Sequence, residues 1–254
     1  MTTSPSSLPL PKELPHPAEI EAEILRRRLW KLHKYYPDKG PLRRELYPKH
    51  MEFFRQGKIH RERLALAGNR VGKTEGIGGY ETTLHLTGLY PDWWEGRRFS
   101  SPINAVASGT TGKTTRDIIQ KKLLGDWGNL GTGLIPAEHI IRTTGKAGIQ
   151  DALELIYVKH VSGGTSLLTL KSYDQRRVAF EGEERHVVWL DEEPPLDIYV
   201  ECLMRTMTTD GLIICTFTPM EGMSDVVMQY LEDGRIPGTG ITAEPQDDES
   251  GSDE

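Results

Sequence analysis

The chain has 254 residues, yet it contains only two cysteines and no long hydrophobic run. Cys202 and Cys215 lie at no metal-ligand spacing and in apolar surroundings, so we expect two small core residues and no structural zinc. No run approaches the roughly 18 apolar residues of a membrane-spanning helix. Residues 1–17 are rich in serine and proline and lack the apolar core of a signal peptide. The sequence therefore predicts a soluble, cytosolic protein without membrane contact.

Acidic residues are unevenly distributed along the chain, whose formal net charge is −6. Residues 231–254 contain eight acidic residues and one basic residue, a net charge of −7, which leaves +1 for residues 1–230. A nearly neutral body with basic clusters is compatible with a nucleic-acid partner, which an evenly spread negative charge would disfavour. The acidic segment predicts a disordered tail that keeps the protein soluble, competes with DNA for a basic surface or binds a partner.

Composition and apolar spacing divide the chain into four segments. Residues 1–17 predict a flexible arm. Residues 18–42 predict a helix, as far as residue 36, and then a linker, because apolar residues recur at helical spacing before a proline-containing break. Residues 43–230 predict one α/β domain, and residues 231–254 predict the disordered tail. The apolar residues that define the helix are Ile20, Ile24, Leu25, Leu29 and Leu32.

Residues 64–74 contain the most informative pattern in the chain. An apolar run leads into a glycine-containing loop that ends in Gly72-Lys73-Thr74, and helix-compatible residues follow, which is the strand–loop–helix order of a phosphate-binding loop. Backbone N–H groups of such a loop surround phosphate oxygens, Lys73 would reach the β- and γ-phosphates, and the Thr74 hydroxyl would bind Mg²⁺. The predicted nucleotide-binding residues are Gly68, Asn69, Arg70, Val71, Gly72, Lys73 and Thr74.

The same spacing occurs a second time, in residues 107–114, again after an apolar run. Either loop alone could be a glycine- and threonine-rich turn that happens to contain a lysine. The first loop begins with Ala67 where the strict pattern has glycine, so the pattern by itself does not decide between them. An acidic strand end further along the chain would complete either site, and we favour the first loop because of the context given below.

Another apolar run, residues 187–190, leads directly into Asp191, Glu192 and Glu193. Continuous apolar runs are typical of buried parallel strands, and ligands of open α/β sheets gather at the carboxyl ends of such strands. Asp191 is therefore placed to hold Mg²⁺, directly or through water, and Glu192 to activate the attacking water as a general base. Glu193 is the alternative base, and solvated acids at a strand end are the alternative to a site.

Further strands are expected downstream and between the motifs. Residues 212–219 form an apolar run that ends in hydroxyls, where Thr216 or Thr218 could sense the γ-phosphate by hydrogen bonding, unless both are simply good strand residues. Residues 153–158 and 166–171 flank a glycine-containing turn and predict a hairpin, and residues 178–180 predict a short strand.

The three motifs together resemble the N-terminal ATPase domain of tailed-bacteriophage terminase large subunits, the motors that package DNA into capsids. The resemblance implies an α/β P-loop NTPase fold of the additional-strand, RecA-like type, with a mostly parallel central sheet between helices. It also implies that residues 107–114 form the family's second strand and following turn, towards the DNA rather than the nucleotide. It extends from about residue 43 to residue 230 and is most specific in residues 64–74, 86–94, 189–194 and 216–219.

The resemblance assigns a role to each predicted site residue. ATP would be the substrate and Mg²⁺ the cofactor, with residues 68–74 as the P-loop and Lys73 neutralising phosphate charge. Asp191 would be the metal ligand and Glu192 the general base. Arg70 resembles the loop arginine that acts near the γ-phosphate in several family members, with a solvent-facing loop residue as the alternative. The coupling sensors would be Thr216 and Thr218.

The resemblance also implies translocation of double-stranded DNA into a viral capsid, in the cytoplasm of the host bacterium. The expected partners are DNA, further copies of this chain in a ring, a portal protein, a small terminase subunit and a separate nuclease chain. The neighbouring copy would supply an arginine, and the candidates are Arg142, Arg176, Arg177 and Arg205. The helix after the second loop could contact DNA phosphates, or present an ordinary solvated face, through Lys113, Arg116, Lys121 and Lys122.

Two departures from the family pattern limit these expectations. Fewer than 40 residues follow Pro219, which leaves no room for the usual C-terminal nuclease domain, so we expect no DNA cleavage by this chain. The upstream glutamine that reads adenine in many relatives is not evident, because residues 49–54 occupy its region and Gln56 only lies close by. The alternative functions are a helicase- or repair-type DNA-dependent ATPase and a nucleotide-binding subunit that needs a partner chain for turnover.

Overall fold

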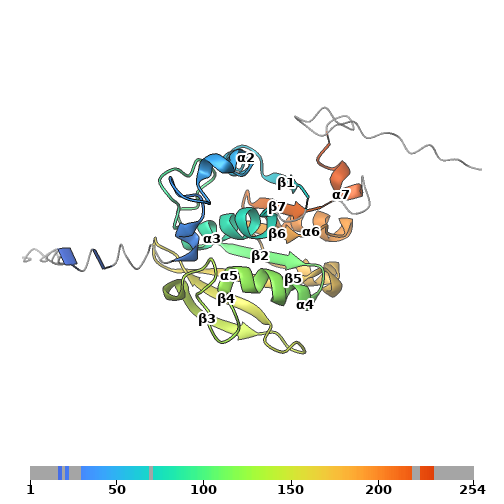
Figure 1. The fold of residues 1–254 in the computed structure, drawn as a ribbon. Coiled ribbons are helices and arrows are strands. Elements are labelled where there is room, and N and C mark those ends of the chain that lie inside the picture. The colour runs from blue at the N-terminus through green and yellow to red at the C-terminus, as the bar shows by residue number, and fades with distance from the viewer. Residues whose placement is uncertain (1–16, 19–20, 23–29, 69–70, 219–223, 232–254) are drawn as a thin grey trace, which may run out of the picture.

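A seven-stranded sheet forms the centre of the computed structural model, which describes residues 17–18, 21–22, 30–68, 71–218 and 224–231 (Figure 1). The strand order is β1-β7-β6-β2-β5-β4-β3, in which the first five strands run parallel and β4 pairs antiparallel with both neighbours. This confirms the predicted α/β fold with a mostly parallel sheet. The strands are β1 Glu62–Leu66, β2 Asn104–Gly109, β3 Ile140–Gly145, β4 Leu153–Lys159, β5 Thr165–Ser172, β6 Val187–Asp191 and β7 Leu212–Phe217.

The order of the central strands follows from their sequences. Every residue of β6 and β7 is buried, as their continuous apolar runs predict for strands covered on both faces. β7 is inserted between β1, which precedes the first glycine loop, and β6, which carries the acids. This strand order agrees with the additional-strand fold type that the resemblance implies. The predicted hairpin is also present, as β4 and β5.

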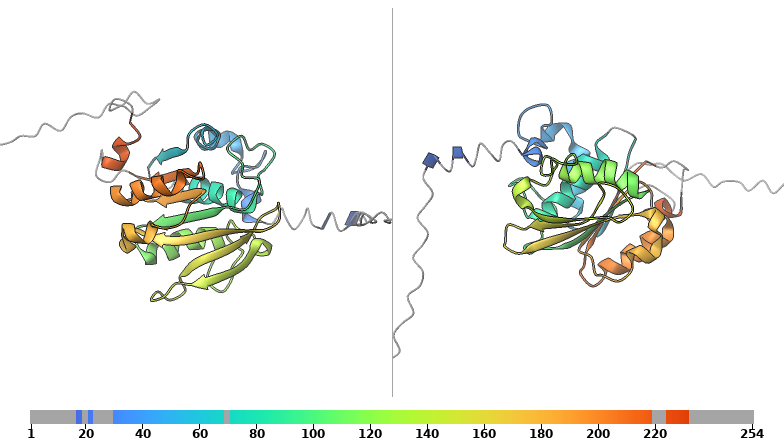
Figure 2. Two further views of the ribbon diagram at one scale, coloured as in Figure 1. Left: turned by 180° about the vertical axis from the view of Figure 1, so that it is seen from behind. Right: turned by 90° about the horizontal axis from the view of Figure 1, so that it is seen from below.

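Helices cover both faces of the sheet. Figure 1 shows α3, α4 and α5 in front of it, and the view from behind in Figure 2 shows α6 on the opposite face. Each glycine loop is followed by a helix that contains a π-helical stretch, Lys73–Gly79 before α3 and Thr115–Gln120 between α4 and α5. The α-helices are α2 Pro48–Gln56, α3 Tyr80–Thr87, α4 Gly112–Thr114, α5 Lys121–Leu124, α6 Leu196–Thr206 and α7 Asp225–Met228.

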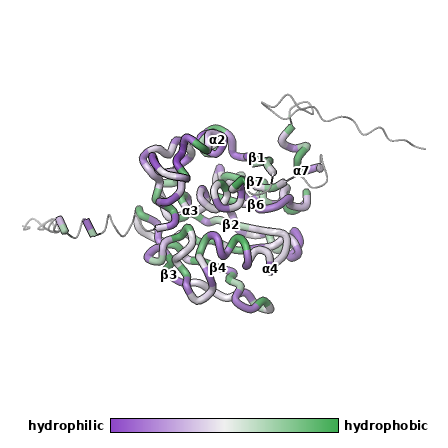
Figure 3. Tube along the Cα trace, viewed as in Figure 1, coloured by the Kyte–Doolittle hydropathy of each residue, from purple (hydrophilic) through white to green (hydrophobic). Residues whose placement is uncertain are grey.

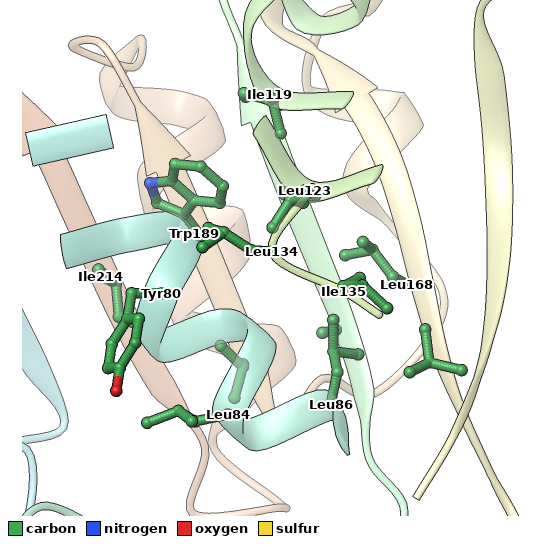
Figure 4. Packing of buried hydrophobic residues seen from close by; sticks show 14 of the residues in the cluster. Tyr80, Leu84, Leu86, Ile119, Leu123, Leu134, Ile135, Leu168, Trp189 and Ile214 are labelled. Atoms are coloured by element: carbon green, nitrogen blue, oxygen red, sulfur yellow. The ribbon is translucent and has the colours of Figure 1, made fainter. Parts of the chain in front are cut away.

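Alternate residues of the strands divide the interior into two cores. Trp189 and Ile214 face the core under α3 and α5, where they pack near Tyr80 and Leu123 (Figure 4). Their strand neighbours face the second core, under α6, which also contains both cysteines, as predicted. The tube in Figure 3 is coloured as hydrophobic along β7, at the centre of the molecule.

Two expectations about secondary structure were wrong. Residues 178–180 do not form a strand but belong to the 3-10 helix Arg177–Phe180, which buries Phe180 in the second core. The helix expected up to residue 36 is not continuous, since Lys31–Lys34 is a 3-10 helix and Tyr36 adopts a φ of 54°. A positive φ ends a right-handed helix, and the buried Tyr36 ring is fixed by tertiary contacts that a local pattern does not contain.

The ends of the chain are described only in part. Residues 17–18 and 21–22 are helical. The rest of the expected N-terminal helix before residue 30, residues 1–16 of the arm and residues 232–254 of the tail lie outside the described residues. No helix in the described part is long and apolar enough to cross a membrane.

A buried charge cluster attaches β1 to α3. Arg63 and Glu81 have side-chain exposures of 4% and 0% and form two hydrogen bonds of 2.8 and 3.0 Å. His85 Nε2 lies 3.1 Å from Glu81 Oε1. Burial would raise the pKa of Glu81, but Arg63 and His85 outweigh it and hold that pKa below its usual value. The cluster fixes the helix that follows the first glycine loop to the strand that precedes it.

Replacing Glu81 tests this cluster. Glu81→Gln leaves the Arg63 guanidinium buried without a counter-charge, so we expect the free energy of unfolding to fall by about 3–5 kcal/mol. Glu52→Gln is the control because Glu52 pairs with Arg55 on the surface, where the expected loss is under about 1 kcal/mol. Urea denaturation measures both variants, and equal small losses would contradict a structural role for the buried pair.

Candidate functional site

The first glycine loop wraps around the ammonium group of its own lysine. Lys73 is buried, and its Nζ donates hydrogen bonds to Ala67 O at 2.7 Å, Gly68 O at 2.9 Å and Thr218 Oγ1 at 2.6 Å. Gly72 has a φ of 87°, a conformation that favours glycine, which explains its place before the lysine. The lysine therefore lies inside the loop and next to the end of β7. The loop residues Asn69 and Arg70 lie outside the described residues.

Asp191 is the buried acid at the end of β6, and hydroxyl groups surround it. Its Oδ1 accepts a hydrogen bond from Thr216 Oγ1 at 2.7 Å, and its Oδ2 accepts one from Thr74 Oγ1 at 3.3 Å. The indole N–H of Trp189 donates to Thr216 Oγ1 at 2.8 Å and so fixes the orientation of that hydroxyl. Burial raises the pKa of Asp191 to about 6, against the opposing effect of the two threonine hydrogen bonds.

Glu192 follows Asp191 in an unusual backbone conformation. Its φ is 63°, which costs a non-glycine residue about 1–3 kcal/mol and is most often found at functional sites. Two contacts hold it there: its N–H donates to Thr216 O at 3.1 Å, and the Tyr173 hydroxyl donates to Glu192 O at 2.9 Å. The Glu192 side chain is exposed, whereas that of Glu193 is partly buried. The fold thus places a solvent-accessible carboxylate directly beside the buried one.

The donor atoms at this edge suit Mg²⁺. Thr74 offers a hydroxyl and Asp191 a carboxylate, which are the oxygen ligands that a hard cation prefers. No group of three or more histidine, cysteine or acidic side chains that could hold a metal occurs within the described residues. Protein sites for Mg²⁺ commonly use one or two side chains and complete the coordination with phosphate oxygens and water. The residues present fit such a shared site.

The second glycine loop differs from the first at the start of its helix and in the exposure of its lysine. The helix after it begins at Gly112, whose N–H donates to Asp174 Oδ2 at 3.2 Å, so an internal carboxylate already occupies the anion-binding end of that helix. Thr111 caps the same end by accepting from Thr114 N at 3.1 Å. Lys113 is exposed rather than enclosed by the loop. A phosphate would have to displace the Asp174 carboxylate here. In the first loop Lys73 contacts only carbonyl and hydroxyl oxygens within the part of the chain that the structure describes, and no carboxylate there would have to leave it.

Residues that no motif indicated support the first loop from behind. The Tyr36 hydroxyl donates to Gly76 O at 2.8 Å and lies 2.7 Å from His50 Nδ1. Burial lowers the pKa of His50, and a hydrogen bond to the backbone of Val71 opposes this effect. Glu75 forms ion pairs with Lys31 and with Lys122, which belongs to the helix after the second loop. These pairs span long sequence separations, so the sequence carries no local signal for them.

Comparisons with known proteins show the family of this chain. The family described as "Terminase large subunit, T4likevirus-type, N-terminal" matches residues 64–251, which is most of the chain. This chain belongs to the large terminase family.

A curated relative, the terminase large subunit of Salmonella phage P22, is 36% identical over 206 residues. The match covers 73% of this chain but only 41% of that relative, so the chain spans about two fifths of the relative's length. Two solved structures of the large terminase from a thermophilic bacteriophage, one in complex with ADP, are 13% and 15% identical to this chain. Each match covers 67% of this chain and 37% of the other, with a TM-score of 0.45.

The four candidate arginines of this large terminase chain differ in their surroundings. Arg177 and Arg205 both pair with the buried Glu201 at 2.9 Å, and the Arg142 guanidinium lies 3.6 Å from the centre of the Tyr157 ring. Arg176 is exposed, has a φ of 63°, and its guanidinium has no ion-pair partner in the described part of the chain. It follows β5 and is anchored by its neighbour Arg177.

The basic helix of this terminase chain is largely compensated by acids. Arg116 pairs with Asp117 and Lys121 with Asp126, both at 2.7 Å, while Lys122 pairs with Glu75. Of the four residues that could contact DNA, only Lys113 is without an ion pair to a described residue. These pairs favour an ordinary charged face along most of this helix.

Gly78 tests how tightly the site is packed. A Cβ at this position would lie 2.1 Å from Trp189 Nε1, the atom that orients Thr216. We therefore expect Gly78→Ala to lower the free energy of unfolding by about 1–3 kcal/mol through overpacking. Gly145→Ala is the control, because its Cβ would have no neighbour closer than 3.9 Å. Equal unfolding curves for the two variants would show that Trp189 is not packed as described.

Proposed function

We propose that this chain binds and hydrolyses Mg²⁺–ATP and that hydrolysis drives double-stranded DNA into a viral capsid. The observation that carries the proposal is the convergence of the Lys73 ammonium, the Thr74 hydroxyl and the Asp191 carboxylate at one edge of the sheet. A cation for phosphate charge and oxygen ligands for a divalent ion are the two requirements of phosphoryl transfer. The family match supports the same interpretation, since large terminases are packaging proteins.

Each residue of the site then has a distinct role. The backbone N–H groups of residues 68–74 would surround the phosphates, and Lys73 would leave its carbonyl partners to neutralise phosphate charge. Thr74 and Asp191 would hold Mg²⁺, which supplies further charge neutralisation when bound. Glu192 would orient the attacking water and accept its proton, and Arg70 would act near the γ-phosphate.

Thr218 and Thr216 are suited to report the state of the nucleotide. Thr218 Oγ1 contacts both Lys73 Nζ at 2.6 Å and Ala67 O at 3.0 Å, so a phosphate that draws Lys73 away would break one of its two hydrogen bonds at the end of β7. Thr216, also in β7, donates a hydrogen bond to Asp191, the proposed Mg²⁺ ligand. We propose that β7 passes this change to the rest of the chain.

The partners belong to the proposal as well: a ring of copies, a portal protein, a small terminase subunit and, if this chain cleaves no DNA, a separate nuclease, in the cytoplasm of the host bacterium. A second candidate function uses the same nucleotide-binding residues. This is a nucleotide-binding subunit that requires a partner chain for turnover. A helicase- or repair-type ATPase would use the same site and differ by separating DNA strands.

ATP hydrolysis by matched variants tests the site. We expect Glu192→Gln to lower kcat by about 10²–10⁴-fold with ATP binding retained, because a general base is lost. Lys73→Ala should lose ATP binding, whereas Lys113→Ala and Glu193→Gln should keep both binding and turnover. Turnover measured with and without double-stranded DNA distinguishes a motor from a partner-dependent subunit. Loss of binding in Lys113→Ala would show that the second loop is the nucleotide site.

Arg176 is the arginine that we propose acts on a neighbouring copy. Arg176→Ala should lower DNA-stimulated turnover by about 10³–10⁵-fold, the usual effect of removing such an arginine. Mixing Arg176→Ala with Glu192→Gln should restore part of the activity, because one copy keeps the catalytic acid and the other keeps the arginine. Arg142→Ala is the control and should keep its turnover. No recovery in the mixture would contradict action between copies.

A further inference from the structure

A pocket of about 540 Å³ with aromatic walls lies beside the helix that follows the first glycine loop. Residues 32–38 and 89–93 provide its two sides, and Tyr80 of α3 lies between them. Tyr80 stacks on Trp93 with ring centres 6.3 Å apart and planes inclined by 6°, and Tyr36 meets Tyr80 edge-on at 5.0 Å. The pocket therefore has an aromatic wall whose rings pack on one another, with the Arg44 side chain beside it.

The rim of this pocket combines apolar, acidic and basic groups, since Arg44 also lines it. Tyr35, Tyr90 and Trp93 are only partly buried, although the guanidinium groups of Arg98 and Arg44 lie 5.2 Å from the ring centres of Tyr90 and Trp93. Asp38 and Asp92 are exposed at the rim. Asp38 pairs with Arg44, whereas Asp92 has no ion pair with any residue that the structure describes. Aromatic grooves with an acidic rim are suited to proline-rich segments that carry a basic residue, because the polyproline II conformation is ordered before binding.

The chain itself contains a segment of this chemistry. Leu8-Pro9-Leu10-Pro11-Lys12 supplies two prolines, two apolar side chains and a lysine, within the Pro/Ser-rich residues 1–17. Lys12 is complementary in charge to Asp92. About 20 residues connect this segment to Leu32 at the pocket wall, which can span roughly 30 Å where the chain is helical and up to about 65 Å where it is extended. Attachment to the same chain makes this docking intramolecular, so that even a weak site can be filled.

We propose that residues 8–12 dock into the aromatic pocket of the same chain. The prolines pack beside the partly buried rings of Tyr35, Tyr90 and Trp93, and Lys12 pairs with Asp92. The pocket shares Tyr36 with the candidate site, where its hydroxyl holds Gly76 O. Docking therefore buttresses the helix that carries Thr74, but it does not require that the chain hydrolyses ATP. Hydrogen exchange can therefore detect the docking even in a chain that does not hydrolyse ATP.

Hydrogen exchange of the full-length chain tests the docking. Pro9→Ser/Pro11→Ser removes both prolines of the segment, so the backbone amides of residues 31–38 and 89–93 should exchange several-fold faster than in the unchanged chain. Pro5→Ser/Pro15→Ser removes two prolines from the same arm outside the segment and should leave exchange unchanged. Equal exchange in all three chains, or equal acceleration in both variants, would overturn the proposal.

A peptide of residues 4–17 provides the reciprocal test. Added to Pro9→Ser/Pro11→Ser, it should restore the slow exchange of the pocket, and it should fail to do so when Asp92→Lys is introduced at the exposed rim. Protection in the unchanged chain should not depend on protein concentration. Protection that increases with concentration would show that a second copy supplies the arm, and a peptide that restores nothing would contradict recognition of this segment.

Discussion

The parallel pairing of β1, β7 and β6 is the constraint on which the candidate site depends. Its register sets Leu66 beside Phe217 and Asp191 beside Thr216, so three strands end at the same edge. The glycine loop, the end of β7 and the acid are thereby brought together although up to about 150 residues separate them. A buried carboxylate is costly unless it is hydrogen-bonded, and the hydroxyls of Thr74 and Thr216 meet that requirement.

The two Gly-Lys-Thr loops show why spacing alone does not define a site. Both follow parallel strands and both open a helix with a π-helical stretch. What separates them is distant in sequence: Asp174 binds the second loop, while Thr218 and Asp191 face the first. The residues at the carboxyl ends of neighbouring strands therefore distinguish the two loops. The loop itself contributes backbone N–H groups and its lysine.

The elements that could be predicted are those with a pattern in a continuous stretch of sequence. The buried strands β6 and β7, the hairpin and the glycine loop each appear in a continuous stretch of sequence. The Tyr36 contacts with His50 and Gly76 and the buried Arg63–Glu81 pair depend on packing between distant segments, which no window of the sequence contains. The prediction of a strand at residues 178–180 was wrong because three residues are too few to show a period, and they form a 3-10 helix with Phe180 buried.

The central claim is that the first glycine loop and Asp191 bind one nucleotide together with Mg²⁺. A crystal structure of the chain with Mg²⁺ and a non-hydrolysable ATP analogue tests it most directly. The account predicts phosphates enclosed by residues 68–74, Lys73 moved from Ala67 O to the phosphates, and Mg²⁺ beside Thr74 and Asp191. Phosphates at Gly112 and Lys113, with Asp174 displaced, would contradict it.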